Sequence, residues 1–200
     1  MSTRILVVIG HPLAGSLSHE LGQRYAEAAR AAGAEVRVRD LSERQPANPP
    51  DRASLRSVRE GDRSWLDADV AADLADLEWA QHVLIVFPQW WGLYPAVLKA
   101  WIDRSFVSGV TYRSTAGYRW EPLLTGRTAR LIMTCDVPRF YNQLVYRDAA
   151  ISALRRATLG YCGIKTIGVS RFTPVKTSTP QAREKWLAAA GRFGTADARR

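Results

Sequence analysis

The sequence predicts an α/β fold, a three-layer sandwich in which a five-stranded parallel sheet lies between helices. Two observations support this prediction. Continuous apolar, β-branched runs such as 4–9 and 83–87 are typical of strands that are covered on both faces. Between such runs, apolar residues recur at helical spacing, as they do over 66–80. Strands that alternate with helices form a parallel sheet, and five of them most often take the order 2-1-3-4-5.

The first third of the chain contains two predicted strands and one helix. Residues 4–9 form the first strand. A helix begins at Leu17, because apolar residues repeat from there at helical spacing, and Gly33 is a good position for it to end. Residues 35–39 alternate between apolar and charged side chains, which predicts a strand at the sheet edge. The polar stretch 40–64 has no period, and such a segment in a compact domain is usually functional or mobile.

The middle of the chain continues the alternation of helix and strand. The helix over 66–80 is followed by the strand over 83–87. A further helix starts near Pro95, since proline suits the first turn of a helix. Residues 107–127 then form a second long loop with several aromatic side chains, and 128–134 is the fourth strand.

The last third of the chain supplies the fifth strand and two more helices. A third irregular stretch over 135–145 leads to a helix over 146–159, which Gly160 could close. Residues 164–171 form the fifth strand, and 181–193 the last helix.

The bulk composition indicates one globular domain. Two hundred residues with 46% hydrophobic content are enough for a large core. No repeat or linker divides the chain, so we expect a single domain over 1–200, with 194–200 as a flexible tail. No apolar run approaches the roughly 18 residues of a membrane span, and the N-terminus lacks the features of a signal peptide. We therefore expect a cytoplasmic protein.

The cysteine content and the net charge exclude some classes of protein. Cys135 and Cys162 are too few for a disulfide framework or a structural zinc site, so we interpret them as free thiols and expect no metal. The net charge of +9 raises the question of nucleic-acid binding. The basic residues are scattered, however, and no recognisable DNA- or RNA-binding motif accompanies them. We expect no nucleic-acid partner.

The segment over 10–18 follows the first strand and is the first candidate site. In a sheet of this order, ligands bind beyond the carboxyl ends of the strands, where strands one and three part. The segment runs directly into a helix, whose N-terminus offers unpaired N–H groups and a partial positive charge that suit a phosphate. Ser16, Ser18 and His11 can add donors. The alternative, that Ser16 merely caps the helix, is equally compatible with this stretch.

The second candidate follows the third strand and reads Pro88-Gln89-Trp90-Trp91-Gly92. A flat aromatic wall beside an amide would suit a tricyclic flavin ring, and glycine would let the backbone approach closely. The alternative is that a tryptophan packs under the next loop. Two adjacent tryptophans at this strand end favour the wall.

The third candidate follows the fourth strand and would lie across the crevice from the tryptophans. Thr134 could simply cap the strand end. Tyr141, further along, could fill the core or project into the crevice, and the sequence leaves both readings open.

Together these segments resemble the NAD(P)H:quinone oxidoreductases of the flavodoxin-like superfamily, which include DT-diaphorase-like and modulator-of-drug-activity-like flavoproteins. The most specific motif is the block over 87–112, which begins FPQWWGLYPAVLKAWIDR. GHPLAGSLS at 10–18 and GYCGIK at 160–165 add to it, so that the resemblance spans nearly the whole chain. It implies a flavodoxin-like fold and a bound flavin.

The resemblance also implies roles for single residues. One group would hold the flavin phosphate, a second would line the isoalloxazine ring, and a third would form the turn after strand four. The groups are His11, Ser16, Leu17 and Ser18; Pro88, Gln89, Trp90 and Trp91; and Met133, Thr134, Cys135 and Asp136.

The chain departs from the family pattern after strand four. Relatives often have Thr-Thr-Gly-Gly where this chain has Met-Thr-Cys-Asp, and an inward carboxylate of Asp136 would disfavour the anionic reduced ring. DT-diaphorase also has a tyrosine and a histidine further along this loop. Tyr141 can stand in for the tyrosine and is the candidate catalytic side chain, but no histidine follows His82.

The activity implied by the resemblance is ping-pong hydride transfer from NAD(P)H through flavin N5 to a quinone-like acceptor. The 10–18 loop suits a single phosphate, which favours FMN over FAD. Relatives are homodimers, and the loops over 40–64 and 107–127 are available for that contact. Alternatives are a regulatory ancillary subunit of a membrane transporter and a flavodoxin-type electron carrier. Carriers are typically acidic, whereas this chain has a pI near 10.1.

Overall fold

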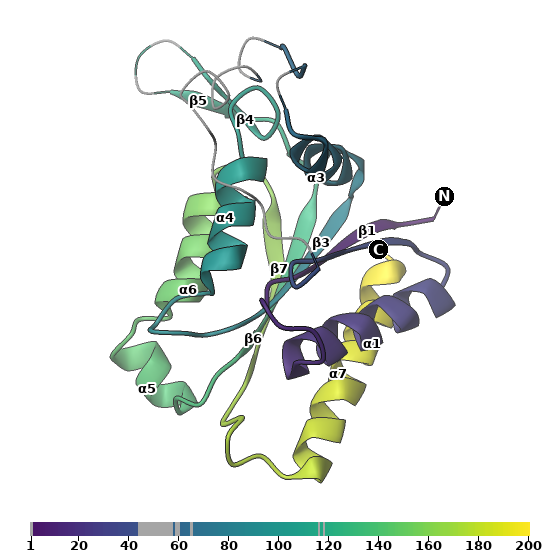
Figure 1. The fold of residues 1–200 in the computed structure, drawn as a ribbon, viewed down its shortest axis with the longest axis vertical. Helices are drawn as coiled ribbons and strands as arrows, with labels where there is room; N and C mark the ends of the chain where they lie inside the picture. Colours follow the sequence, from purple (N-terminus) through teal and green to yellow (C-terminus); the bar gives the residue numbers. More distant parts are fainter. Residues whose placement is uncertain (1, 44–57, 59–60, 65, 116, 118) are drawn as a thin grey trace.

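A parallel sheet runs through the middle of the computed structural model, which describes residues 2–43, 58, 61–64, 66–115, 117 and 119–200 (Figure 1). Its five strands lie in the order β2-β1-β3-β6-β7, and each neighbouring pair is parallel. This confirms the predicted fold class and strand order. The strands are β1 (Arg4–Ile9), β2 (Glu35–Asp40), β3 (His82–Pro88), β6 (Thr128–Thr134) and β7 (Lys165–Phe172).

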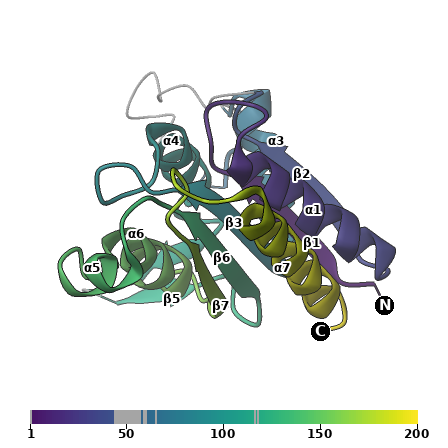
Figure 2. The same ribbon diagram turned by 90° about the horizontal axis from the view of Figure 1, so that it is seen from below.

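Helices cover both faces of the sheet (Figures 1 and 2). One face carries α1 (Leu17–Ala31) and α7 (Pro180–Ala198). The other face carries α3 (Ala68–Trp79), α4 (Ala96–Ser105), α6 (Ala149–Ser152) and the π-helix η2 (Ala153–Gly160), with the short helix α5 (Arg139–Leu144) beside them. In the described part of the chain, no helix combines the length and the apolar character needed to cross a membrane.

Strand β1 shows why its sequence is continuously apolar. Side chains alternate between the faces of a strand. Ile5 and Val7 pack in the core beneath α1 and α7, whereas Leu6 and Val8 pack in the core beneath the other helices. Both sets are fully buried or nearly so, which is the pattern of a central parallel strand.

Two stretches expected to be irregular contain regular structure. Within 107–127, β4 (Tyr112–Ser114) and β5 (Trp120–Pro122) form an antiparallel pair. Within 135–145, α5 begins directly after Pro138, and the helix expected over 146–159 is observed as α6 and η2. These elements are too short to show a period in sequence. Most of the irregular stretch expected over 40–64 lies outside the described residues.

The expectation of a flexible tail over 194–200 is wrong for residues 194–198, which continue helix α7. The apolar stripe of this helix ends at Phe193, so hydrophobic spacing does not predict the extra turn. Two contacts hold that turn in place, one an ion pair and the other a close approach to helix α1. Asp197 is fully buried and bound by Arg130, and Gly194 lies so close to α1 that a Cβ atom there would be 2.3 Å from the Tyr25 carbonyl oxygen.

Candidate functional site

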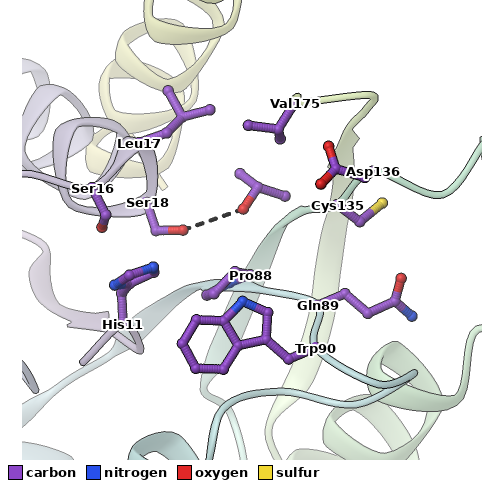
Figure 3. A pocket seen from close by; sticks show the side chains of 11 residues that line it. His11, Ser16, Leu17, Ser18, Pro88, Gln89, Trp90, Cys135, Asp136 and Val175 are labelled. Atoms are coloured by element: carbon purple, nitrogen blue, oxygen red, sulfur yellow. Dashed lines mark hydrogen bonds between the residues drawn. The ribbon is translucent and has the colours of Figure 1, made fainter. Parts of the chain in front are cut away.

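A pocket of about 220 Å³ opens where the carboxyl ends of β1, β3 and β6 meet (Figure 3). All three segments singled out in the sequence reach it. The structure brings together the predicted residues other than Trp91, Met133 and Tyr141, and it adds Val175, which was not among the predicted site residues. The lining consists of His11, Ser16, Leu17, Ser18, Pro88, Gln89, Trp90, Thr134, Cys135, Asp136 and Val175.

The first wall is the N-terminus of α1. Ser16 is its N-cap, and the Ser16 hydroxyl oxygen accepts a hydrogen bond of 3.2 Å from the His19 backbone N–H. The capping role is therefore present. It leaves the hydroxyl proton of Ser16 available for a ligand, so capping and phosphate binding are compatible. Ser18 links this wall to the third one, since its Oγ lies 3.3 Å from Thr134 Oγ1.

The imidazole of His11 lies between the first wall and the second. Its Nδ1 lies 3.0 Å from the Leu13 backbone nitrogen and 3.1 Å from the Leu13 carbonyl oxygen, so Nδ1 accepts from the N–H in one tautomer and donates to the carbonyl in the other. Burial lowers the pKa of His11, more than its contacts with Leu13 and Asp40 raise it. The ring is therefore neutral at pH 7. It meets Trp90 edge-on, with 5.5 Å between ring centroids.

The second wall contains one tryptophan of the expected pair. Trp90 lines the pocket, but Trp91 is fully exposed and does not. The cause is a tight turn in which Trp90 and Leu93 exchange backbone hydrogen bonds of 2.8 and 3.0 Å. Trp91 and Gly92 occupy the two central positions with φ of +50° and +79°, the pattern of a type I′ turn. This turn directs the second indole away from the pocket.

The amide of Gln89 has a fixed orientation. The carboxylate of Asp148 receives two hydrogen bonds from Arg171 and one of 3.0 Å from Asn142 Nδ2. Because a carboxylate only accepts, the side-chain oxygen of Asn142 must face Gln89, and it accepts a 2.7 Å bond from Gln89 Nε2. Gln89 Oε1 is then buried without a hydrogen-bond partner among the residues that the structure describes. Such an unpaired acceptor costs roughly 1–3 kcal/mol, and a ligand N–H would satisfy it.

The third wall carries the residues that depart from the family pattern. The Asp136 side chain points toward the pocket in Figure 3, and its Oδ1 accepts a 2.5 Å bond from the Lys176 backbone N–H. Burial raises the pKa of Cys135, so its thiol stays protonated at neutral pH. Met133 is fully buried in the core and lines no part of the pocket.

Tyr141, the candidate catalytic side chain, does not line the pocket. It lies on α5, partly exposed, and meets Tyr146 edge-on at 5.3 Å between ring centroids. The residue of this loop that reaches the pocket is its neighbour Asn142, through Gln89. No periodicity or motif in the sequence distinguishes Asn142, whereas Val175 belongs to the stretch Pro174-Val175-Lys176, which adds to the family resemblance.

Comparison with known proteins identifies relatives. A family described as having a flavodoxin-like fold matches residues 3–193. The chain is 30% identical over 151 residues to a ribosyldihydronicotinamide dehydrogenase-like protein of Penicillium crustosum, across 66% of this chain and 57% of that protein. It is 25% identical over 201 residues to NAD(P)H dehydrogenase (quinone) 1 of Rattus norvegicus, across 92% of this chain and 73% of that protein. The chain thus spans less than two thirds of the first of these relatives.

A solved structure supports the fold. The FMN-dependent NADH-azoreductase of Bacillus anthracis in complex with FMN superposes with a TM-score of 0.71 at 19% identity, across 96% of this chain and 99% of that one. At this identity the likeness establishes the shared fold.

Proposed function

The chain belongs to the flavodoxin-like fold family, and from this premise we propose that it is a flavin-dependent NAD(P)H:quinone oxidoreductase with FMN as its cofactor. A relative named as an NAD(P)H dehydrogenase (quinone) and a structural neighbour that holds FMN support the assignment. The observation that carries it is a pocket lined by an aromatic ring, a helix N-terminus and Gln89, whose buried Oε1 has no hydrogen-bond partner among the described residues.

The residues present fit a flavin mononucleotide. The N-terminus of α1, with the hydroxyls of Ser16 and Ser18, would hold its single phosphate. The neutral His11 would make one hydrogen bond to the ligand through Nε2. Trp90 would stack against the ring, and Gln89 Oε1 would accept from a ring N–H. When bound, FMN supplies two-electron hydride chemistry at its N5, so that NAD(P)H and the quinone would occupy the same place in turn.

The protein's own side chains then bind and orient rather than transfer protons. Among the lining residues, neither Cys135, whose pKa is raised by burial, nor the neutral His11 is poised as a strong base. The Gln89–Asn142 bond holds an acceptor in place before the ligand arrives, which limits reorganisation on binding.

We also propose a cytoplasmic homodimer. Exposed apolar side chains gather around α5 and beside the Trp90 turn, and a second copy of the chain would cover them. They are Trp91, Leu93, Phe140, Leu144 and Val145. Two unpaired, buried cysteines are consistent with a reducing compartment. Light scattering of the purified protein would report the mass of one chain if the dimer proposal is wrong.

The test of the proposed function is flavin retention followed by reduction. Purified protein is mixed with excess FMN or FAD and desalted, its visible spectrum is recorded, and heat-released flavin is identified. We expect FMN to be retained and to be bleached anaerobically by NADPH or NADH. Retention without bleaching would indicate an electron carrier instead. Absence of either flavin after desalting would overturn the proposal.

Two tryptophans provide a matched control for the binding site. Trp90 lines the pocket and is 44% exposed; Trp120 lies in strand β5 and is 46% exposed. Aromatic stacking on a planar base contributes roughly 1–3 kcal/mol. Trp90→Ala should therefore weaken FMN binding by about tenfold or more, whereas Trp120→Ala should leave it unchanged.

A further inference from the structure

A second cavity, of about 480 Å³, lies at the opposite edge of the sheet. It is formed where β1, β3 and β6 begin and where α7 ends. Strand β3 separates it from the first pocket by seven residues, roughly 20 Å of extended chain. No part of the proposed flavin chemistry uses this cavity.

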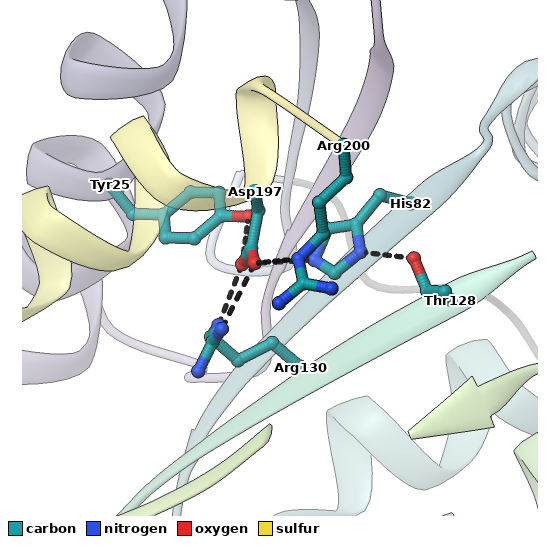
Figure 4. Close-up of polar contacts among 6 residues, drawn as sticks. All are labelled: Tyr25, His82, Thr128, Arg130, Asp197 and Arg200. Atoms are coloured by element: carbon teal, nitrogen blue, oxygen red, sulfur yellow. Dashed lines mark hydrogen bonds and ion pairs between the residues drawn. The ribbon is translucent and has the colours of Figure 1, made fainter. Parts of the chain in front are cut away.

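The floor of the cavity is a buried cluster of charged and polar groups around Asp197 (Figure 4). Asp197 is fully buried and accepts hydrogen bonds of 2.6 and 2.9 Å from Arg130 and one of 3.0 Å from the Tyr25 hydroxyl. The bidentate pair with Arg130 compensates its negative charge. Asp197 therefore leaves little net negative charge to the cavity.

His82 adds a buried imidazole to the same floor. Its Nδ1 lies 2.7 Å from Thr128 Oγ1. Its Nε2 is 3.3 Å from Asp197 Oδ2, close enough for an ionic contact, but it makes no hydrogen bond of good geometry within the described residues. The Arg200 guanidinium completes the cluster, with Nε 3.5 Å from Asp197 Oδ1.

The walls carry an excess of positive charge. Arg4, Arg127 and Arg200 line the cavity, and among its described lining residues Asp197 has the sole side-chain carboxylate. Glu78, which lies near Arg127, is engaged in a bidentate pair with Arg63 at 2.7 and 2.9 Å.

Arg127 holds a half-buried guanidinium at the wall of the cavity. Burial lowers its pKa, and the neighbouring charge of Arg4 lowers it further, although Glu78 opposes this. Its guanidinium is nonetheless held in place, since Nη1 donates to the backbone oxygens of Leu77 and Ala80 at the end of α3. A fixed, partly desolvated guanidinium beside a second one is a preorganised site for negative charge.

We propose that this cavity binds a small oxyanion with at least two negative charges, of the phosphate-ester or polycarboxylate class. Guanidinium groups bind both classes through paired, charge-assisted hydrogen bonds. The volume lies within the range of small-molecule sites. Occupancy would join the starts of β1 and β6 to the end of α7 and so stabilise the fold.

The test is isothermal titration calorimetry at constant ionic strength. Pyrophosphate is titrated in one series and citrate in another. Protein saturated with FMN is used, so that the phosphate-binding segment of the first pocket is occupied. Arg4→Gln and Arg200→Gln each remove one exposed guanidinium and should weaken binding by roughly tenfold. The control Arg113→Gln makes the same change of charge in strand β4, where Arg113 pairs with Glu121. It should leave binding unchanged.

The titration tests the anion site independently of the proposed flavin site. Tighter binding of pyrophosphate than of citrate assigns the phosphate class, and the reverse assigns polycarboxylates. Absence of saturable heat, or an equal loss in Arg113→Gln, would overturn the site. If the protein retains no FMN, the titration is made on the protein as purified and on Ser16→Ala. Loss of binding in Ser16→Ala would place the anion in the first pocket and also overturn the proposal.

Discussion

Gln89 and Asn142, 53 residues apart in sequence, are joined by a 2.7 Å hydrogen bond from Gln89 Nε2 to Asn142 Oδ1. Asn142 is fully buried and receives its own orientation from the carboxylate of Asp148. One residue outside the pocket therefore fixes the orientation of the Gln89 amide.

Asn142→Leu should weaken FMN binding without touching the cofactor. Leucine has a similar branched shape, although it is larger, and it cannot accept from Gln89, so the amide loses its fixed orientation. We expect about a five- to tenfold loss of FMN affinity, which corresponds to roughly 1 kcal/mol for one hydrogen bond. Quenching of flavin fluorescence measures it. Gln143→Leu, an exposed neighbour, is the control.

A double-mutant cycle makes the prediction specific. If Asn142 acts through Gln89, then Gln89→Leu and the double variant should bind FMN equally weakly. Additive losses would show that Asn142 acts by another route.

The contrast between Gln89 and Asn142 illustrates what the sequence could reveal. Gln89 directly follows a buried apolar strand, and the rule that ligands bind at the carboxyl ends of parallel strands places it at the site. Asn142 lies in a stretch without period, and its partners are distant along the chain. A contact of this kind arises from tertiary packing and leaves no local pattern.

Trp91 and Asp197 are two further residues whose structural roles the sequence pattern does not predict. Adjacent tryptophans predict a shared wall, but the backbone of the turn, with positive φ at Trp91, separates the two rings. The last turn of α7 depends on a charged residue that apolar spacing ignores. The strands, the sheet order and most of the pocket lining were predictable because each depends on hydrophobic pattern or on strand-end position.

Ser16→Ala and Thr179→Ala should separate capping from cofactor binding. Each residue is the N-cap of a long helix and accepts a 3.2 Å bond from a backbone N–H. Loss of either cap should cost about 1 kcal/mol in urea unfolding of the apoprotein. Only Ser16→Ala should also weaken FMN binding, since Thr179 is not part of the pocket lining. Equal FMN affinity in both variants would leave Ser16 with a structural role alone.

Trp91→Asn should stabilise the protein. A left-handed conformation costs roughly 1–2 kcal/mol for most side chains but less for asparagine, and Asn-Gly is the preferred pair for a type I′ turn. The indole is fully exposed, so its removal sacrifices no burial within one chain. At a protein concentration low enough to keep the chain monomeric, we expect urea unfolding to show a gain of about 0.5–1 kcal/mol, with FMN affinity unchanged. A tenfold loss of affinity would mean that Trp91 contacts the cofactor after all.

Asp197 should make stability depend on acid pH. Burial raises its pKa, but Arg130 and the nearby His82 outweigh this effect and hold the pKa well below its usual range. A carboxyl group with a lowered folded-state pKa binds fewer protons in the folded state than in the unfolded state. Its stabilisation is therefore complete above the unfolded pKa of about 4 and is lost as the pH falls below that value.

Asp197→Asn isolates this contribution. At pH 7 the variant should lose roughly 3–5 kcal/mol in urea unfolding, because Arg130 is left as a buried charge without its partner. Glu78→Gln removes the exposed pair with Arg63 and should cost less than about 1 kcal/mol. Between about pH 5 and pH 3 the free energy of unfolding of the wild type should fall more steeply than that of Asp197→Asn, so that the difference between the two narrows by roughly 1 kcal/mol. If the free energies of unfolding of the two proteins run parallel with pH, protonation of Asp197 is not the cause of the loss of stability in acid.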